Sequence, residues 1–239
     1  MLTTGINFKN FKKKTKKLNF KKKLKFIYDN RNQILISLSK NYKDNFDKKT
    51  VNKYKKASNF RLIGMGGSIL GAQAIYDFLN HKIKKKFKFI NNLQNDLSKE
   101  KKYTNLVISK SGNTIETIVN FNILTKKSDK NIFITENKKN YISILAEKLK
   151  AEVVHHNNYI GGRYSVLSEV GMLPAELMGL NANKFRQLNL LLKNKNFLNS
   201  LVSNVDATLQ YIKNKKFNSI IINYDEKSQN FFSWYQQLV

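Results

Sequence analysis

The sequence predicts an α/β protein in which a mostly parallel β-sheet lies between two layers of helices. Short apolar runs recur from Phe60 onward, helical segments separate several of them, and glycine-rich or serine-rich turns follow two of the runs. Strands that alternate with helices form a parallel sheet covered on both faces. The expected architecture is therefore a three-layer αβα sandwich.

The apolar runs give five strands, and the helical periodicity between them gives the helices. A further helical stretch is expected from Pro174 to Tyr211, and Ile220–Ile222 is then expected to form a strand that opens a second α/β unit. The other predicted elements are strands at 60–63, 87–90, 106–108, 132–134 and 152–154, and helices beginning at about Ser68, Thr114 and Tyr141.

Three ranges follow from these patterns. Residues 1–56 form a Lys-rich helical lead-in, residues 57–180 form the first α/β domain, and residues 181–239 begin a second such domain without completing it. The Lys runs of the lead-in, Lys12–Lys14 and Lys21–Lys23, are interpreted as a solvated face. Its apolar positions at helical spacing are Leu18, Leu24, Ile27, Ile34, Leu35 and Leu38.

The composition excludes several kinds of site. The 239 residues include no cysteine, so disulfides, thiolate metal sites and a cysteine nucleophile are excluded, and a reducing compartment such as the cytoplasm is the expected location. There is no apolar stretch of membrane-spanning length, and Lys residues interrupt the segment 1–25 too often for the apolar part of a secretory signal. The sequence thus predicts no membrane association.

The formal charge of +28 would by itself favour a nucleic-acid partner. AT-rich codon usage can produce the same excess of Lys, Asn, Ile and Phe, whatever the function. The cations are almost all Lys, with few Arg residues to make bidentate contacts to bases or phosphates. A nucleic-acid partner is therefore not expected.

The first motif is a glycine-rich turn, Gly64–Gly71, between a predicted strand and a predicted helix. Glycines there allow a sharp turn and a close approach to a ligand, and the helix N-terminus offers free N–H groups to an anion. No Gly-Lys-Ser/Thr follows, so the turn is not a P-loop, and Ile69 replaces the third glycine of the dinucleotide fingerprint. A tight turn of purely structural use is the alternative.

The second motif, Ser109–Thr117, also follows a strand and opens a helix. Asn113 and Glu116 have the spacing of a capping box, which predicts a helix start near Thr114. Hydroxyls at such an N-terminus suit phosphate oxygens, although a cap of purely structural use remains the alternative. The hydroxyls in question are Ser109, Ser111 and Thr114, and the predicted buried stripe of the helix is Ile115, Ile118 and Val119.

The third motif is Gly161–Ser168, in which two glycines precede Arg163. A guanidinium held close to a ligand could stabilise negative charge that develops on oxygen, whereas a surface turn with a solvated Arg is the alternative. Just upstream, His155 and His156 end a predicted strand, so their side chains point to opposite sides and make a poor metal site. Neither is assigned a catalytic role.

In this order and at these separations, the three motifs resemble the glucose-6-phosphate isomerase family. The family's glycine-serine loop, phosphate loop and Gly-Gly-Arg-x-Ser segment match Gly66–Gly71, Ser109–Thr117 and Gly161–Ser165, within a resemblance that runs from about Phe60 to Leu238. It implies the sugar isomerase (SIS) fold, no cofactor or metal, and a homodimeric parent. The implied activity interconverts glucose 6-phosphate and fructose 6-phosphate through an enediol.

Carried over residue by residue, the resemblance implies one catalytic residue and a set of substrate-binding residues. Arg163, supported by Gly162, would stabilise the enediolate. The implied ligands of the 6-phosphate are Ser109, Lys110 through its backbone, Ser111 and Thr114. The implied contacts to the sugar are Gly67, Ser68 and Gln237.

Two departures from the family pattern qualify this resemblance. The general-base glutamate is expected two positions after Val239, so the chain is expected to be an amino-terminal fragment that binds sugar phosphate without turnover. Glu116 and Glu169 are not expected to replace it, because the first caps a helix and the second lies in a helix that packs on the core. The second departure is Ser111-Gly112-Asn113, where many members have Thr-Phe-Thr.

Two other functions stay open at this point. A bifunctional isomerase would also accept mannose 6-phosphate, and a comparison of rates on the two aldoses would separate it. A non-catalytic SIS module would bind phosphosugars to regulate another process, and an attached helix-turn-helix would favour it.

Overall fold

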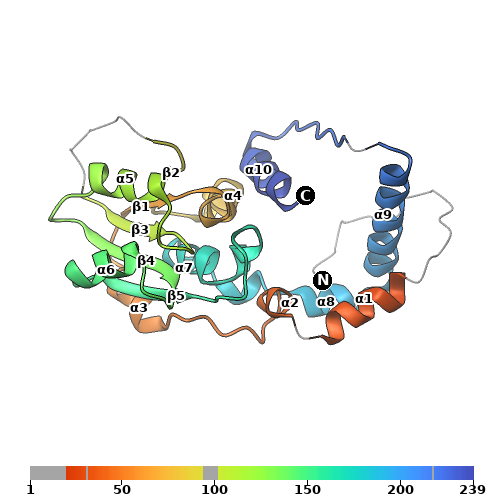
Figure 1. Cartoon of the computed structure of the whole chain (residues 1–239), viewed down its shortest axis with the longest axis horizontal. Coiled ribbons are helices and arrows are strands. Elements are labelled where there is room, and N and C mark those ends of the chain that lie inside the picture. Colours follow the sequence, from red (N-terminus) through yellow and green to blue (C-terminus); the bar gives the residue numbers. More distant parts are fainter. Residues whose placement is uncertain (1–19, 31, 94–101, 217) are drawn as a thin grey trace. The chain divides into compact units, whose positions relative to one another are not determined.

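The computed structural model describes residues 20–30, 32–93, 102–216 and 218–239 (Figure 1). The chain divides into two compact units, of which the smaller contains the described part of Met1–Asn41 together with Arg186–Ile222. The larger unit contains Tyr42–Phe185 and Asn223–Val239. These units differ from the domain ranges 1–56, 57–180 and 181–239, which stay a prediction.

A five-stranded parallel sheet forms the centre of the larger unit (Figure 1). All five strands predicted between Phe60 and Val154 are confirmed, and the strand order is β2-β1-β3-β4-β5. In the pairing of β1 with β3, Gly64 lies opposite Ile108. The bounds are β1 Asn59–Gly64, β2 Lys86–Ile90, β3 Thr104–Ile108, β4 Lys130–Glu136 and β5 Glu152–His156.

Helices cover both faces of this sheet, as the sequence predicts. Alternate strand residues point to opposite faces, so Leu62 packs in one apolar cluster with residues of α3, α4 and α7, and Ile63 packs in another with residues of α5 and α6. The result is the three-layer αβα sandwich. The bounds are α3 Lys48–Lys53, α4 Leu70–Leu79, α5 Ile115–Leu124, α6 Tyr141–Lys148 and α7 Glu169–Leu177.

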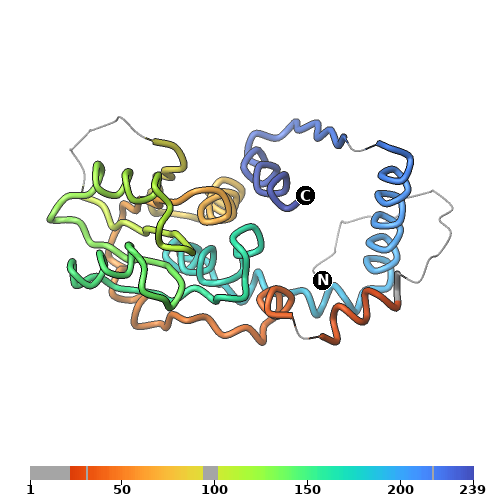
Figure 2. Tube along the Cα trace, in the orientation of Figure 1, coloured from red at the N-terminus to blue at the C-terminus, as the bar shows by residue number. Residues whose placement is uncertain are grey.

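The last helix, α10 (Gln229–Leu238), lies beside α4 although the two are far apart in sequence (Figure 2). Asn230 Nδ2 donates a hydrogen bond to Asp77 Oδ2, which joins the two helices. Single 3₁₀ turns connect several elements of this unit. They are η1 Gly66–Ser68, η2 Asn80–Lys82, η3 Gly162–Leu167, η4 Ala182–Lys184 and η5 Glu226–Ser228.

The smaller unit is helical throughout its regular elements, which agrees with the helical lead-in. Leu188 N donates to Leu38 O over 3.2 Å, so the segment after residue 185 packs on the lead-in. Leu18 and Lys12–Lys14 lie outside the described residues. The helices are α1 Phe20–Asp29, α2 Gln33–Ser37, α8 Leu188–Leu192 and α9 Lys195–Lys213.

Several expected local features are wrong. Ile220–Ile222 forms no strand, because a strand needs a hydrogen-bonded neighbour and this segment pairs with none in the described part of the chain. The helical stretch from Pro174 to Tyr211 is broken into α7, η4, α8 and α9, with Gly179 at a positive φ of 90° where α7 ends.

The helix α5 begins next to Thr114, as predicted, but the expected capping box of Asn113 and Glu116 is wrong. Its N-cap is Thr114, without a side-chain cap, and the Asn113 carboxamide oxygen accepts a hydrogen bond from Tyr141 N instead of capping the helix. Ile115, expected in the buried stripe, is 72% exposed. The helix buries Thr117, Asn120 and Phe121 instead.

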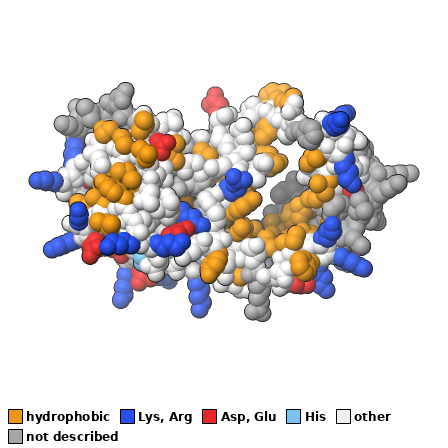
Figure 3. All heavy atoms as spheres, viewed as in Figure 1, with side chains coloured by type: hydrophobic (Ala, Val, Ile, Leu, Met, Phe, Trp, Pro, Cys, Tyr) orange, Lys and Arg blue, Asp and Glu red, His pale blue; other side chains and the backbone are white. Residues whose placement is uncertain are grey.

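Positive charge is dispersed over the visible surface. Lys and Arg side chains project from many elements on the face drawn in Figure 3, without gathering on one helix or strand. None of the helices in the described ranges combines the length and the apolar character that a bilayer crossing requires.

Candidate functional site

The connections that follow β1 and β3 diverge at the carboxyl ends of these neighbouring strands. The chain leaves β1 for α4 on one face of the sheet and leaves β3 for α5 on the other. Ligands of open α/β sheets bind where neighbouring strands send their connections to opposite faces. The first two sequence motifs follow these two strands.

The glycine-rich turn lies against the end of β3. A methyl group at Gly64 would lie 3.0 Å from both Ile108 O and Ser68 Cβ, so Ser68 is close to the point where β3 ends. Gly66 has a φ of +52°, a conformation that favours glycine, and it starts the 3₁₀ turn that leads into α4.

The second motif forms a compact loop with its hydroxyls at the same edge. Ser109 is buried, its Oγ lies 2.9 Å from Thr114 Oγ1, and it accepts a hydrogen bond from Gly112 N over 3.1 Å. Ser111 is exposed, and its Oγ accepts from Asn113 N over 3.3 Å. Two of the three expected hydroxyls are therefore in direct contact at the start of α5.

Lys110 belongs to the same loop, but its ammonium is held by other groups. Nζ donates to Asn158 O over 2.8 Å and lies 3.3 Å from Glu136 Oε1, while the Lys110 carbonyl accepts from Glu136 N. Burial tends to raise the pKa of Glu136, but hydrogen bonds from Lys138 and Lys110 outweigh burial and lower it. The carboxylate is therefore charged at neutral pH and fixes the Lys110 side chain.

The third motif packs its backbone directly on the glycine-rich turn. A methyl group at Gly67 would lie 2.2 Å from the Gly162 carbonyl atoms and 2.7 Å from Arg163 N. Ser165 Oγ strengthens the contact by donating to Gly162 O over 2.6 Å and approaching Gly67 O at 3.3 Å. The first and third motifs therefore form one continuous surface.

The Arg163 side chain is exposed. Among the described residues it has no hydrogen-bond or ion-pair partner, so it is available to a ligand. Its backbone N lies against Gly67, next to the turn that touches the end of β3. The backbone that carries this cation thus lies at the same sheet edge as the loop with Ser109, Ser111 and Thr114, which we call the hydroxyl loop.

Gln237 reaches this edge from α10. Its Nε2 atom would lie 2.6 Å from a methyl group at Gly66, and its Oε1 atom is buried without a hydrogen-bond partner among the described residues. The structure therefore brings residues of all three motifs and Gln237 to the carboxyl edge of the sheet. Glu116 lies in the first turn of α5.

A family model described as Phosphoglucose isomerase matches residues 40–239. The chain belongs to the phosphoglucose isomerase family. Glucose-6-phosphate isomerase of Methanocaldococcus jannaschii is 34% identical over 218 residues, which cover 83% of this chain and 53% of that protein. The corresponding protein of Mycoplasmopsis synoviae is 31% identical over 204 residues, covering 74% and 47%.

This member of the phosphoglucose isomerase family spans about half the length of the curated relatives it matches. A solved structure of a hypothetical protein from Thermus thermophilus is similar with a TM-score of 0.63 and 21% identity, over 94% of this chain and 62% of that one. That similarity shows a shared fold.

Sequence reasoning missed the residues that support the Ser109–Thr114 loop of the second motif. Asn140 caps α6 in a capping box with Ser143, and its Nδ2 donates to Thr135 Oγ1, which in turn donates to Lys110 O. A methyl group at Gly112 would lie 2.0 Å from Asn140 Oδ1. The Asn140-x-x-Ser143 spacing before an apolar run was the available signal.

A buried ionisable cluster was also missed. Glu169 and His156 are 0% and 2% exposed, with Oε2 and Nδ1 lying 3.5 Å apart. Tyr42 Oη donates to Glu169 Oε1 over 2.8 Å. Burial would raise the pKa of Glu169, but the nearby His156 ring and the hydrogen bond from Tyr42 outweigh burial and lower the pKa, while burial and the Glu169 charge raise the pKa of Tyr42.

We expect this cluster to make the fold sensitive to acid. Because the pKa of Glu169 is lower in the folded state than its ordinary 4.5, its contribution is complete above pH 4.5 and is lost as the pH falls through the folded value. Glu169→Gln should cost about 3–5 kcal/mol at pH 7, and the difference should shrink below pH 4.5. Urea unfolding from pH 7 to 3 measures this, and a constant difference would contradict it.

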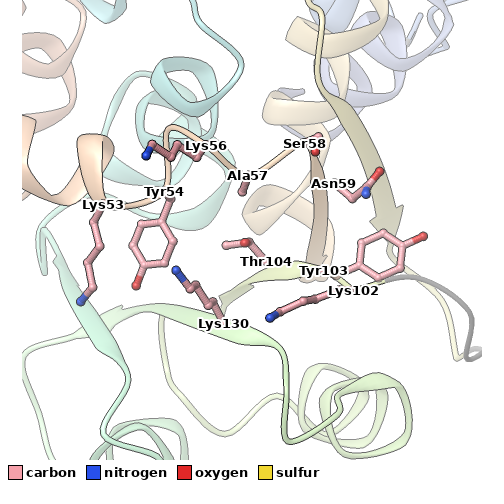
Figure 4. A pocket seen from close by; sticks show the side chains of 10 residues that line it. All are labelled: Lys53, Tyr54, Lys56, Ala57, Ser58, Asn59, Lys102, Tyr103, Thr104 and Lys130. Carbon is pink, nitrogen blue, oxygen red and sulfur yellow. The ribbon is translucent and has the colours of Figure 1, made fainter.

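A basic pocket lies at the opposite edge of the sheet, where β1, β3 and β4 begin (Figure 4). It has a volume of about 340 Å³, and Lys102 and Lys130 point into the same space, while the Lys53 ammonium is paired with Glu152 Oε2 at 2.6 Å. It contains none of the three motifs.

Among the described residues, no group of three or more side chains is arranged to hold a metal ion.

Proposed function

We propose that the protein containing this chain interconverts glucose 6-phosphate and fructose 6-phosphate through a cis-enediol. The observation that carries the proposal is the contact between Gly67 and the Gly162–Arg163 backbone, because it attaches a free guanidinium to the edge that holds the hydroxyl loop. The names of the relatives, which are glucose-6-phosphate isomerases, support the same substrates.

In this proposal the second motif binds the 6-phosphate. Ser109 and Thr114 supply hydroxyls 2.9 Å apart at the N-terminal end of α5, where the helix dipole favours an anion. The exposed Ser111 hydroxyl and the Lys110 backbone complete the phosphate contacts. The Lys110 ammonium takes no part, because Asn158 and Glu136 hold it.

The reacting carbons of the sugar then lie over the glycine turns. Gly67, Ser68 and Gly162 give the close backbone approach, and the unpaired carboxamide oxygen of Gln237 accepts a sugar hydroxyl. Arg163 faces the C1 and C2 oxygens. Its charge stabilises the enediolate that forms when a proton leaves C2 of the aldose or C1 of the ketose.

A general base must carry that proton between C2 and C1. Glu169 cannot serve, because its carboxylate is buried and held by Tyr42 and His156. We propose that the base comes from the region that the relatives have and residues 1–239 do not cover. Residues 1–239 alone should therefore bind sugar phosphate without turnover. We also propose that the parent protein is cytoplasmic and homodimeric.

The assay that tests this function uses the whole protein with fructose 6-phosphate. Formation of glucose 6-phosphate is the expected result, and action on another phosphosugar with no conversion of fructose 6-phosphate would contradict it. Rates on glucose 6-phosphate and mannose 6-phosphate separate a strict isomerase from a bifunctional one. Turnover by purified residues 1–239 would contradict the proposed origin of the base.

The phosphate loop makes a separate prediction. Ser109→Ala should weaken fructose 6-phosphate binding to residues 1–239 by about 10- to 100-fold, because a hydrogen bond to a charged group contributes about 1.5–3 kcal/mol. Calorimetric titration measures the change. Ser58→Ala, in the basic pocket at the opposite edge, is the matched control and should bind like the unmodified chain. Equal affinities of all three proteins would place the phosphate elsewhere.

A further inference from the structure

His156 and Glu169 are an unfavourable pair to bury. They lie at the end of β5 and the start of α7, almost fully shielded from water. Neither His156 Nδ1 nor Glu169 Oε2 has a hydrogen-bond partner in the described part of the chain, and the 3.5 Å between them is long for a hydrogen bond. Apolar side chains of similar volume would often stabilise a fold equally well. Stability alone therefore does not explain why this ionisable pair is buried.

The hydrogen bonds around the pair fix the orientation of both side chains. His156 Nε2 lies 3.0 Å from Ile160 O, and because a carbonyl only accepts, this nitrogen carries a proton. Glu169 Oε1 accepts from Tyr42 Oη and, over 3.3 Å, from Asn45 N, which favours the ionised carboxylate. The remaining nitrogen then faces a negative oxygen. The two atoms that face each other, His156 Nδ1 and Glu169 Oε2, lie 3.5 Å apart.

The His156 ring lies against both ends of the third motif. Ile160 immediately precedes Gly161, and Glu169 immediately follows Ser168, so one ring contacts both flanks of the segment 161–168. Asn45 adds a second tie, because its Nδ2 donates to His155 O over 2.9 Å while its backbone N binds Glu169. The base of the loop is thereby closed by directional interactions.

Arg163 depends on that closure. Its side chain has no partner of its own among the described residues, so only the loop backbone sets where the guanidinium stands. Inside the loop, Ser165 Oγ donates to Gly162 O and Ser168 Oγ donates to Ser165 O over 2.7 Å. These bonds fix the shape of the loop, and the packing of Gly162 on Gly67 holds one side of it on the glycine-rich turn.

We propose that His156 and Glu169 are positioning residues that orient the Arg163 loop towards the sugar carbons. The proposal rests on the proposed isomerase function, because only that function gives Arg163 a developing charge to face. It adds two residues that act through Arg163 without touching substrate. An apolar pair would fill the same volume but would remove the directional contacts at the base of the loop, so that only the packing on the glycine-rich turn would orient it.

The test compares two ligands on residues 1–239. 6-Phosphogluconate carries a carboxylate at C1, where Arg163 should meet it, whereas sorbitol 6-phosphate has the same phosphate and no charge there. The unmodified chain should bind 6-phosphogluconate more tightly. In the double variant His156→Leu/Glu169→Met, that preference should fall about tenfold, with sorbitol 6-phosphate affinity unchanged, because a charge-assisted contact needs accurate placement.

Calorimetric titration with both ligands distinguishes a failure of the proposed function from a failure of the positioning role. No preference in the unmodified chain would overturn both the proposed function and this inference. A preference retained in the folded double variant, or an equal loss of both ligands, would overturn the positioning role alone. If the apolar variant does not fold, His156→Gln/Glu169→Gln replaces it. The side-chain amide introduced at position 156 can still donate to Ile160 O, so the preference should fall by less than tenfold, and a preference equal to that of the unmodified chain would overturn the positioning role.

Discussion

Replacing Arg163 with Gln is expected to lower kcat/KM for fructose 6-phosphate in the whole protein by about 10²- to 10³-fold. That range is the usual loss when one stabiliser of a developing oxyanion is removed. KM should change little, because in the proposed mechanism the second motif still binds the substrate and Arg163 acts mainly on the enediolate. Steady-state rates at several substrate concentrations measure both quantities.

Lys56→Gln is the matched control for Arg163→Gln. It removes the same charge from another exposed residue, which lies in the basic pocket at the opposite edge of the sheet. Its kcat/KM should equal that of the unmodified protein. If the two variants lose activity equally, the effect is one of total charge and Arg163 has no special role. If Arg163→Gln retains full activity, the proposed enediolate contact is wrong.

Replacing Gly67 with Ala is expected to damage both stability and activity. The added methyl would lie 2.2 Å from Gly162 C and O, and backbone atoms cannot rotate aside as a side chain can. The loops must separate, which should cost about 3 kcal/mol of unfolding free energy. A displacement of about 1 Å at Arg163 should lower kcat/KM by about 10²-fold even in folded protein.

Urea unfolding and steady-state kinetics on the same preparation measure the two effects of Gly67→Ala. Gly161→Ala is the control for stability, because its methyl would meet only Tyr164 Cδ2 at 3.9 Å, an ordinary contact. It should unfold within about 0.5 kcal/mol of the unmodified chain. Unchanged stability of Gly67→Ala would show that the two loops are not packed as described.

Features that depend on local sequence were predictable. Apolar runs such as Leu62–Ile63 indicate strands, because a parallel sheet is covered on both faces and its strands are apolar on both sides. The turn at Gly64–Gly71 and the hydroxyls of Ser109 and Thr114 could be found because turns and helix starts have specific residue requirements. Their meeting at one edge follows from parallel strand direction.

Features that depend on tertiary context were not predictable. Asn113 has good capping chemistry, but the neighbouring start of α6 offers its oxygen the Tyr141 N–H, and Thr114 becomes the N-cap. Ile220–Ile222 has strand composition, yet strand formation requires a pairing partner that composition does not supply. The His156–Glu169 pair joins the end of a strand to the start of a helix, and no spacing of residues in the sequence predicts such a contact.

The position of Gln237 over Gly66 has a consequence for the order in which the protein assembles. The hydroxyl loop and its Asn140 support are close in the chain, whereas Gly66 is covered by Gln237 only after α10 has been synthesised and has packed on α4. A nascent chain that ends before Gln229 would contain the hydroxyl loop and Asn140 but would leave Gly66 uncovered. Under the proposed function, the residues that bind the phosphate would thus be present before the Gln237 contact to the sugar.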